Sequence, residues 1–447
     1  MKPGYKTLRL SAVLPLALAL IQTALPTHAG ALADALEQAW PLHPQAAALE
    51  ARAAEAQARA EIAGSLTPGP AALSLGHLND NLGSGRGKQE WEVELATPLW
   101  LPGQKAGHAA EAASVVDEIT ARRAAQRLEL AGELRTAWWA LAATRQAHDL
   151  AQRRLSGAHV LEADVLRRYR AGDLARVDAN QARGETLAAQ AESLQAETAM
   201  QQAERVWRGL TGLPAPARLE AEVLPRSSNT TLEFSGSVRP ELVEGQGFDR
   251  STSSRLSPNG ELAHRINNAA SETHPRLAAL SSAARVANAR LKLALTTRRD
   301  APELAVRLLR ERGDASTPYD NAIGIKLSIP FSSGPRLRRD NAAARAEATQ
   351  AEAEQLQATR RLALDLEQAR RDIAAAEQLA AMAQERREVT TDTLRLAEKT
   401  FSLGESDLTA LLRARAAAFE AEAASIRQET ARGSAISHLK QALGEMP

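Results

Sequence analysis

The clearest pattern in the chain is a strict alternation of apolar and polar residues in two short segments. Residues 90–95 read Glu-Trp-Glu-Val-Glu-Leu, and residues 323–329 alternate Ile and Leu with Gly, Lys and Ser. A period of two is typical of a β-strand with one apolar and one polar face. Weaker alternation upstream of each segment, followed by turn-forming residues, predicts a partner strand for each. The pattern therefore predicts two β-hairpins, at about 71–98 and about 303–331.

Most of the remaining chain has the pattern of long helices. Stretches rich in Ala, Leu, Glu, Arg and Gln run over about 104–170 and about 335–402 with few breaks. Each would be about 100 Å long, because an α-helix rises 1.5 Å per residue. Shorter helical stretches flank each long one and, placed end to end, nearly match its length. We predict a long antiparallel stalk with a hairpin at one end and glycine turns, at Gly172 and Gly404, at the other.

The chain contains two copies of one structural unit. Landmarks of the first unit recur 231 or 232 residues later, which indicates an internal duplication. The matching pairs are His43-Pro44 with His274-Pro275, Thr97-Pro98 with Ile329-Pro330, Gly172 with Gly404, and Gly212 with Gly444. We place the first repeat at 30–213, a linker at 214–273 and the second repeat at 274–447.

Two segments fall outside the repeats. Residues 1–29 combine basic residues, a short apolar stretch and small residues, the layout of a secretory signal peptide. A retained membrane anchor is the alternative. Residues 226–260 are rich in Ser, Thr, Gly and Pro and have no helix or strand period. We expect this part of the linker to be a disordered insertion with no essential role.

Composition excludes several classes of protein. The chain has no cysteine, which excludes disulfides, thiolate metal sites, a catalytic thiol and a lipidated N-terminal cysteine. A net charge of +1 argues against a nucleic-acid binder. No set of residues points to catalysis, to a bound cofactor or to a metal site, and the glycine-rich stretch at 83–87 lacks the other residues of a phosphate loop. We expect a protein that is not an enzyme.

The alternating strands suggest how the chain could enter a membrane. One face of each strand is apolar, and each strand is about long enough to cross a bilayer at a tilt. We expect the lipid-facing residues to be Trp91, Val93, Leu95, Ile323, Ile325 and Leu327, and the lumen-facing residues to be Glu90, Glu92, Glu94 and Lys326. Four strands cannot close a barrel, so several copies must contribute, and three copies would give twelve strands. A soluble amphipathic hairpin packed on a core is the alternative.

The duplicated unit resembles the TolC-like outer membrane efflux proteins. The resemblance rests on the repeat, on the strand ends Glu94–Gly103 and Leu327–Phe331, and on the turn at Gly172. It implies a homotrimer whose twelve-stranded β-barrel lies in the outer membrane of a Gram-negative bacterium. A long α-helical barrel would continue through the periplasm, and its far end would meet a periplasmic adaptor that joins it to an inner-membrane pump.

The resemblance extends to the helical tips. Gly172 with Asp178 six residues later matches the family pattern, whereas the second turn has Gly404 but Ala410 at the sixth position and its acid earlier. The resemblance implies adaptor-contacting residues at Gly172, Leu174, Asp178, Gly404, Asp407 and Leu408. Asp178 and Asp407 are also candidates for charged rings at a constriction. The alternatives are plain glycine caps and solvated surface charge.

The leading hypothesis is an outer-membrane channel of a tripartite efflux system that conducts its cargo passively. The cargo would be metal cations or small toxic compounds, and the short C-terminus and absent acylated cysteine favour the heavy-metal cation branch of the family. The alternatives are a periplasmic coiled-coil adaptor or scaffold, and the outer-membrane duct of a type I protein secretion system.

Overall fold

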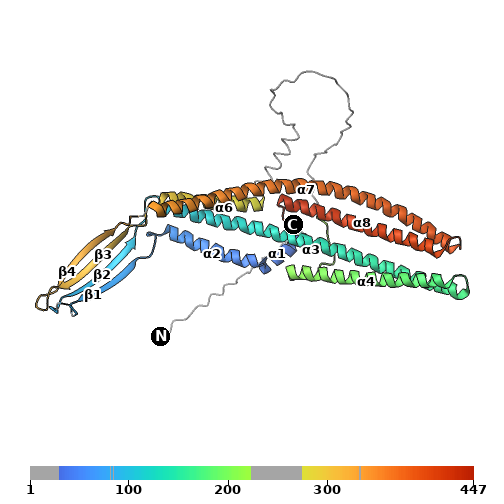
Figure 1. The fold of residues 1–447 in the computed structure, drawn as a ribbon, viewed down its shortest axis with the longest axis horizontal. Coiled ribbons are helices and arrows are strands. Elements are labelled where there is room, and N and C mark those ends of the chain that lie inside the picture. Colours follow the sequence, from blue (N-terminus) through green and yellow to red (C-terminus); the bar gives the residue numbers. More distant parts are fainter. Residues whose placement is uncertain (1–29, 81, 84, 223–273, 332–333) are drawn as a thin grey trace, which may run out of the picture.

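The structure is a computed structural model that describes residues 30–80, 82–83, 85–222, 274–331 and 334–447. Figure 1 shows a four-stranded sheet at one end of an elongated bundle of helices, whose two turns lie at the opposite end. The segments predicted as a signal peptide and as a disordered insertion lie outside the described residues.

Each repeat contains a helix, two strands, a long helix and a further helix, in the order that the sequence predicted. The first repeat comprises α2 (Pro44–Gly64), β1 (Ala72–Asn79), β2 (Gln89–Pro98), α3 (Gln104–Ala171) and α4 (Arg176–Thr211). The second comprises α6 (Pro275–Thr296), β3 (Glu303–Arg312), β4 (Asp320–Ser328), α7 (Gly334–Ser402) and α8 (Leu408–Leu443). At 68 and 69 residues, α3 and α7 are each about 100 Å long.

The two short helices of each repeat lie end to end along the long one. In the first repeat α2 and α4 pack on α3, and in the second α6 and α8 pack on α7. The repeats join because α6 and α8 also pack on α3, so α3 is covered on two sides. The antiparallel stalk expected from the helix lengths is therefore confirmed. Within the described ranges, no helix is both long and apolar enough to cross a membrane.

The conspicuous His-Pro pairs prove to be helix starts. The Nδ1 atom of His43 accepts a hydrogen bond from the backbone N–H of Gln45 at 3.3 Å, and His274 does the same for Arg276 at 3.2 Å. The imidazole thus caps a free N–H of the first turn, while proline follows at a position whose missing N–H costs nothing. Burial lowers the pKa of His274, which favours the neutral ring that such a cap requires.

One helix was missed in the sequence. Before α2, the chain forms α1 (Ala31–Ala39) and a short 3-10 turn, Trp40–Leu42. The apolar side of α1 packs against α3 and α4. Leu32, Leu36 and Ala39 have the spacing of one helical face, but the segment is only nine residues long and follows directly on the apolar N-terminal stretch.

Candidate functional site

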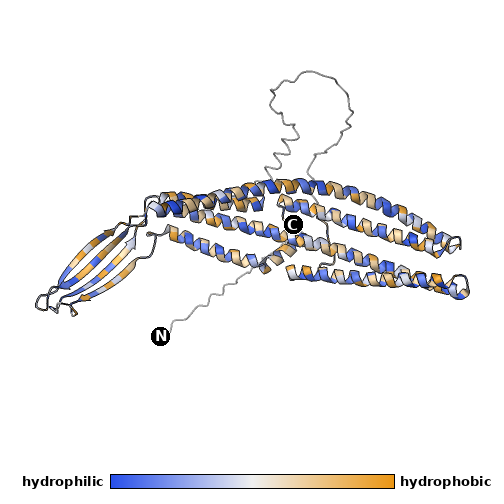
Figure 2. Ribbon diagram, in the orientation of Figure 1, coloured by the Kyte–Doolittle hydropathy of each residue, from blue (hydrophilic) through white to orange (hydrophobic). Residues whose placement is uncertain are grey.

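In the middle of the sheet, apolar and polar side chains lie on opposite faces. Its strand order is β1-β2-β3-β4, all antiparallel. Directly paired residues point to the same face of a sheet. The pairing aligns two apolar rows across all four strands: Leu75, Val93, Leu308 and Ile323, and Leu73, Leu95, Val306 and Ile325. The banding along the strands is visible in Figure 2.

This apolar face is not covered by the chain itself. Leu75, Ile323 and Ile325 are 75%, 77% and 78% exposed, and Trp91 is 52% exposed. Monomeric soluble proteins rarely expose so continuous an apolar surface, which indicates that another apolar medium or partner covers it. Beside the two apolar rows, toward the hairpin loops, Trp91 stacks on His77 of the same face with the ring centroids 4.0 Å apart.

The opposite face carries the charges. Glu90, Glu92, Glu94 and Lys326 lie on it together with Arg307, as the register requires. Arg307 Nη1 lies 3.4 Å from Glu92 Oε1, and Lys326 Nζ lies 3.5 Å from Glu94 Oε1. Because these ion pairs are exposed to solvent, they add little stability. Leu78 and Leu309, near the hairpin loops, are the apolar exceptions on this face.

Aromatic side chains mark both ends of the strands. At the loop end, the Tyr319 hydroxyl donates a hydrogen bond to Gln89, and the guanidinium groups of Arg310 and Arg312 lie 4.7 and 5.1 Å from its ring centroid. At the helical end, Trp100 Nε1 donates to the Ser65 carbonyl at 3.2 Å. Aromatic residues at both ends of a strand layer are typical of proteins placed across a membrane interface.

The two helical turns lie together at the far end of the rod. Gly172 and Gly404 both have left-handed backbones, with φ of +89° and +77°, and a Cβ at either would meet no atom within 4 Å. The backbone angle therefore requires glycine, and the space around both is open. Beneath them an apolar cluster joins α3, α4, α7 and α8: Leu161, Val165, Ala179, Ala182, Phe401, Leu408 and Leu411.

Two predicted tip residues have structural roles that the sequence reading did not foresee. Asp407 precedes α8, and its carboxylate accepts a hydrogen bond from Ala410 N at 2.8 Å; Asp178 reaches back to Ala175 N at 3.0 Å. Both acids thus cap the helix that follows the turn. Leu408 is only 1% exposed, so its side chain holds the tip cluster together and is not available for direct contact with a partner.

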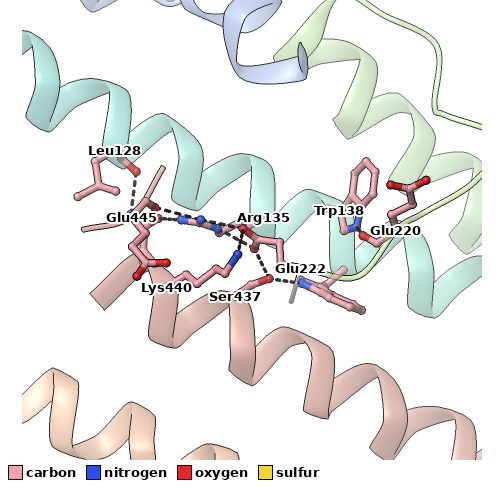
Figure 3. A network of polar contacts seen from close by, with 10 residues as sticks. Leu128, Arg135, Trp138, Glu220, Glu222, Ser437, Lys440 and Glu445 are labelled. Atoms are coloured by element: carbon pink, nitrogen blue, oxygen red, sulfur yellow. Dashed lines mark hydrogen bonds and ion pairs between the residues drawn. The ribbon is translucent and has the colours of Figure 1, made fainter. Parts of the chain in front are cut away.

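A buried polar network joins α3, α8 and the segment that follows α4 (Figure 3). The guanidinium group of Arg135 on α3 binds both carboxylate oxygens of Glu222 at 2.9 Å. It also donates to Gln441 at 2.6 Å, and to the carbonyl of Glu445 at 3.0 Å. Ser437 on α8 donates to Glu222, which ties the segment after α4 to both repeats.

Charges in this network are satisfied despite their burial. Arg135 is 3% exposed, and the side chain of Glu222 is 8% exposed. Burial by itself would raise the pKa of Glu222, but hydrogen bonds from Arg135 and Ser437 and the charges of Arg135 and Lys440 outweigh it, so the pKa is lowered. No sequence motif announces this network, because its members are up to 310 residues apart.

Among the described residues, no three His, Asp or Glu side chains are grouped so that they could hold a metal ion. The functional features there are surfaces: the two faces of the sheet and the paired tips.

Comparison with known proteins agrees with this arrangement. Residues 267–445 match the family model described as outer membrane efflux protein. The solved structure of the outer membrane protein VceC from Vibrio cholerae is similar, with a TM-score of 0.69 and 16% identity over 93% of this chain and 96% of VceC. CusC gives a TM-score of 0.69 at 14% identity over 93% of this chain and 92% of its own.

A third structure, the outer membrane channel CmeC from Campylobacter jejuni, gives a TM-score of 0.66 at 15% identity over 92% of this chain and 85% of CmeC. No curated protein matches the sequence. The structural likeness, at such low identity, concerns the fold, and the family match covers the second repeat. Residues 267–445 therefore have the sequence pattern of an outer membrane efflux protein, and the chain has the same fold as VceC, CusC and CmeC.

Proposed function

We propose that the protein is the outer-membrane channel of a tripartite efflux system, and that it works as a homotrimer. Each copy supplies four strands to a twelve-stranded barrel, and the helices continue as a barrel through the periplasm. The channel carries out no covalent chemistry: an inner-membrane pump and a periplasmic adaptor deliver the cargo, and the channel conducts it passively.

The sheet carries this proposal. It is two-faced, its apolar face is bare, and within the described residues the outer edges of β1 and β4 pair with no further strand. Unpaired edges cannot be left in lipid, because each unsatisfied backbone group costs several kcal/mol there. β1 and β4 run in opposite directions, so β4 of one copy can pair antiparallel with β1 of the next. Repeating this step three times closes a barrel without edges.

In this barrel the two faces of the sheet lie in different surroundings, one in lipid and the other in the pore. The apolar rows, with Trp91, Val93, Leu95, Ile323, Ile325 and Leu327, face lipid. The charged face, with Glu90, Glu92, Glu94 and Lys326, lines the lumen. The strands place the acids Glu90, Glu92, Glu94, Glu311 and Asp320 on this face, against the basic residues Arg307 and Lys326, and the excess of acids in three copies favours cations over anions in the pore. This charge supports metal cations or cationic small compounds as cargo.

The tips are the adaptor-binding end. Gly172 and Gly404 present bare backbone in open space, with Leu174, Asp178 and Asp407 beside them. Bare backbone lets a partner helix approach closely. The shared cluster beneath both turns keeps them side by side, so a single adaptor hairpin can contact both.

A matched pair of variants in the bilayer tests the proposal. Ile323→Arg adds a charge to the apolar face, while Ala322→Arg adds one to the polar face one residue away. Arginine facing lipid near the middle of a bilayer costs about 2–4 kcal/mol per copy. We expect purified wild-type protein and Ala322→Arg to give discrete conductance in planar bilayers and heat-resistant trimers on gels, and Ile323→Arg to lose both. Conductance retained by Ile323→Arg, or absent from the wild type, would contradict the proposal.

A further inference from the structure

Most charges of the sheet lie on its polar face, but the apolar face carries two cations at one end. Within the described strands, the register gives this face no Asp, Glu or Lys and only two arginines, Arg310 and Arg312 of β3. Arg310 pairs with Trp91, and Arg312 pairs with Gln89, so both lie beside the hairpin loops. An arginine on the lipid side of a strand is costly in the middle of a bilayer and costs little at its surface. We therefore expect both arginines at the level of the lipid headgroups.

The two arginines are held beside one aromatic ring. Their guanidinium carbons lie 4.7 and 5.1 Å from the ring centroid of Tyr319, whose hydroxyl donates a hydrogen bond to Gln89. The ring attracts both cations, while the cations repel one another. An anion bound by both guanidinium groups would relieve this repulsion.

The chain supplies no such anion in its described part. Among the described residues, neither guanidinium group forms an ion pair or donates a hydrogen bond, and Arg312 Nε is buried without an acceptor. The acids of the neighbouring strand positions, Glu90, Glu311 and Asp320, lie on the opposite face. Each guanidinium group has five N–H donors in a planar fork that matches the oxygens of a phosphate group. We propose that Arg310 and Arg312 bind the phosphate groups of a lipid in the outer leaflet of the membrane.

The position of this arginine pair favours a lipid as the source of the phosphate. The proposal rests on the proposed function, in which the helices lie in the periplasm and the hairpin loops, at the other end of the sheet, reach the outer surface (Figure 1). Because the pair lies on the lipid side of the barrel wall, the contents of the pore do not reach it. Arginine stems lie along apolar surface and place the charge among the headgroups, and the apolar rows next to the pair can pack against acyl chains. These features suit a phosphorylated glycolipid such as lipid A.

Lipid binding by the purified protein tests the site. The full chain in a non-ionic detergent is titrated with bisphosphorylated lipid A, and bound lipid is counted by native mass spectrometry. We expect Arg310→Gln with Arg312→Gln to weaken binding about tenfold or more, since a hydrogen bond to a charged group is worth at least about that factor. The matched control is Arg298→Gln with Arg299→Gln, which removes the same charge from exposed positions beyond the helical end of β3 and should bind as the wild type does. Equal weakening by both pairs would refute the site.

Discrimination between lipids by the wild-type protein is a second readout that needs no variant. We expect binding to fall about tenfold for lipid A from which the phosphates have been removed. Excess inorganic phosphate should not displace lipid A, because it lacks the acyl chains that bury apolar surface. Equal binding of the phosphate-free lipid, or displacement by inorganic phosphate, would overturn the proposal. Conductance in planar bilayers tests the channel separately, so a wild type that conducts but binds both lipids equally would lose the lipid site and keep the proposed function.

Discussion

The long helices α3 and α7 are copies of one another, yet they differ in what covers them. Sixteen residues of α3 are buried, against five of α7. Within the described residues, α3 packs on α1, α2 and α4 of its own repeat and also on α6 and α8, whereas the main contacts of α7 are with α6 and α8. The same sequence pattern therefore forms a helix covered by several neighbours in the first repeat and a largely exposed helix in the second. We expect the uncovered side of α7 to face a neighbouring copy in the proposed trimer.

The uncovered side of α7 carries an apolar stripe. Met382, Val389 and Leu396, each seven residues apart, are 58%, 62% and 50% exposed. Such a spacing places them along one seam of the helix, as in a coiled coil. At the position of Met382 the first repeat has Leu150, which is 9% exposed. We infer that α7 packs on α2 and α4 of the next copy as α3 packs on α6 and α8.

The largest expected effect comes from a charge placed on this stripe. Met382→Asp should abolish heat-resistant trimers, because each of three interfaces would bury a carboxylate without a partner. The single chain should still fold, since Met382 is exposed within it. Leu150→Asp, the counterpart on α3, should instead unfold the chain itself. Gel mobility reports trimers, and circular dichroism reports helix content.

Ala381→Asp is the control for Met382→Asp. Ala381 is exposed on the same helix but points about 100° away from its neighbour, so trimers should persist. Trimers that survive Met382→Asp would show that α7 is not an interface, and the difference between the two helices would then need another explanation.

A smaller effect is expected in the buried network around Arg135, which has no counterpart around the equivalent position of α7 in the described part of the chain. Arg135 of α3 corresponds to Glu367 of α7, an exposed residue paired with Arg371 at 3.5 Å. Arg135→Ala leaves the buried Glu222 with only Ser437 and the more distant Lys440, at 3.8 Å, as partners, and should lower the free energy of unfolding by about 3 kcal/mol. Glu367→Ala removes a surface pair and should cost about 0–1 kcal/mol. Urea unfolding in detergent measures both.

The pH dependence gives the same test a second readout. Because the folded state lowers the pKa of Glu222, its stabilisation is complete above the ordinary glutamate pKa of about 4.3. It is lost as the pH falls through the lowered pKa, where the folded chain must also take up the proton. Wild-type stability should therefore fall in this acid range, and Arg135→Ala should lose less there. Parallel acid profiles would mean that the network does not set the acid sensitivity.

Local patterns in the sequence were enough to predict the elements, but not their long-range contacts. The alternation at Glu90–Leu95 predicts a β-strand with one apolar and one polar face. The predicted lengths of the helices imply an elongated antiparallel bundle. The Arg135–Glu222 pair could not be predicted, because any of the many arginines and glutamates in this charge-balanced chain has the same local pattern. The capping by Asp407 was readable, since an acid just before a helical stretch is a common N-cap.

The smallest effect distinguishes two roles of the tip acids. Asp407→Ala removes the cap on α8 and should cost about 1 kcal/mol, whereas Asp407→Asn keeps an equally good cap and should cost a few tenths. If three copies of Asp407 also form a ring at the constriction, both variants should reduce the preference for cations in planar bilayers, because both remove its charge. We expect Asp407→Asn to combine nearly normal stability with weaker cation preference. Unchanged selectivity in Asp407→Asn would show that Asp407 only caps α8. The two tips would then differ in the position of the capping acid, which precedes α8 at Asp407 but lies inside α4 at Asp178.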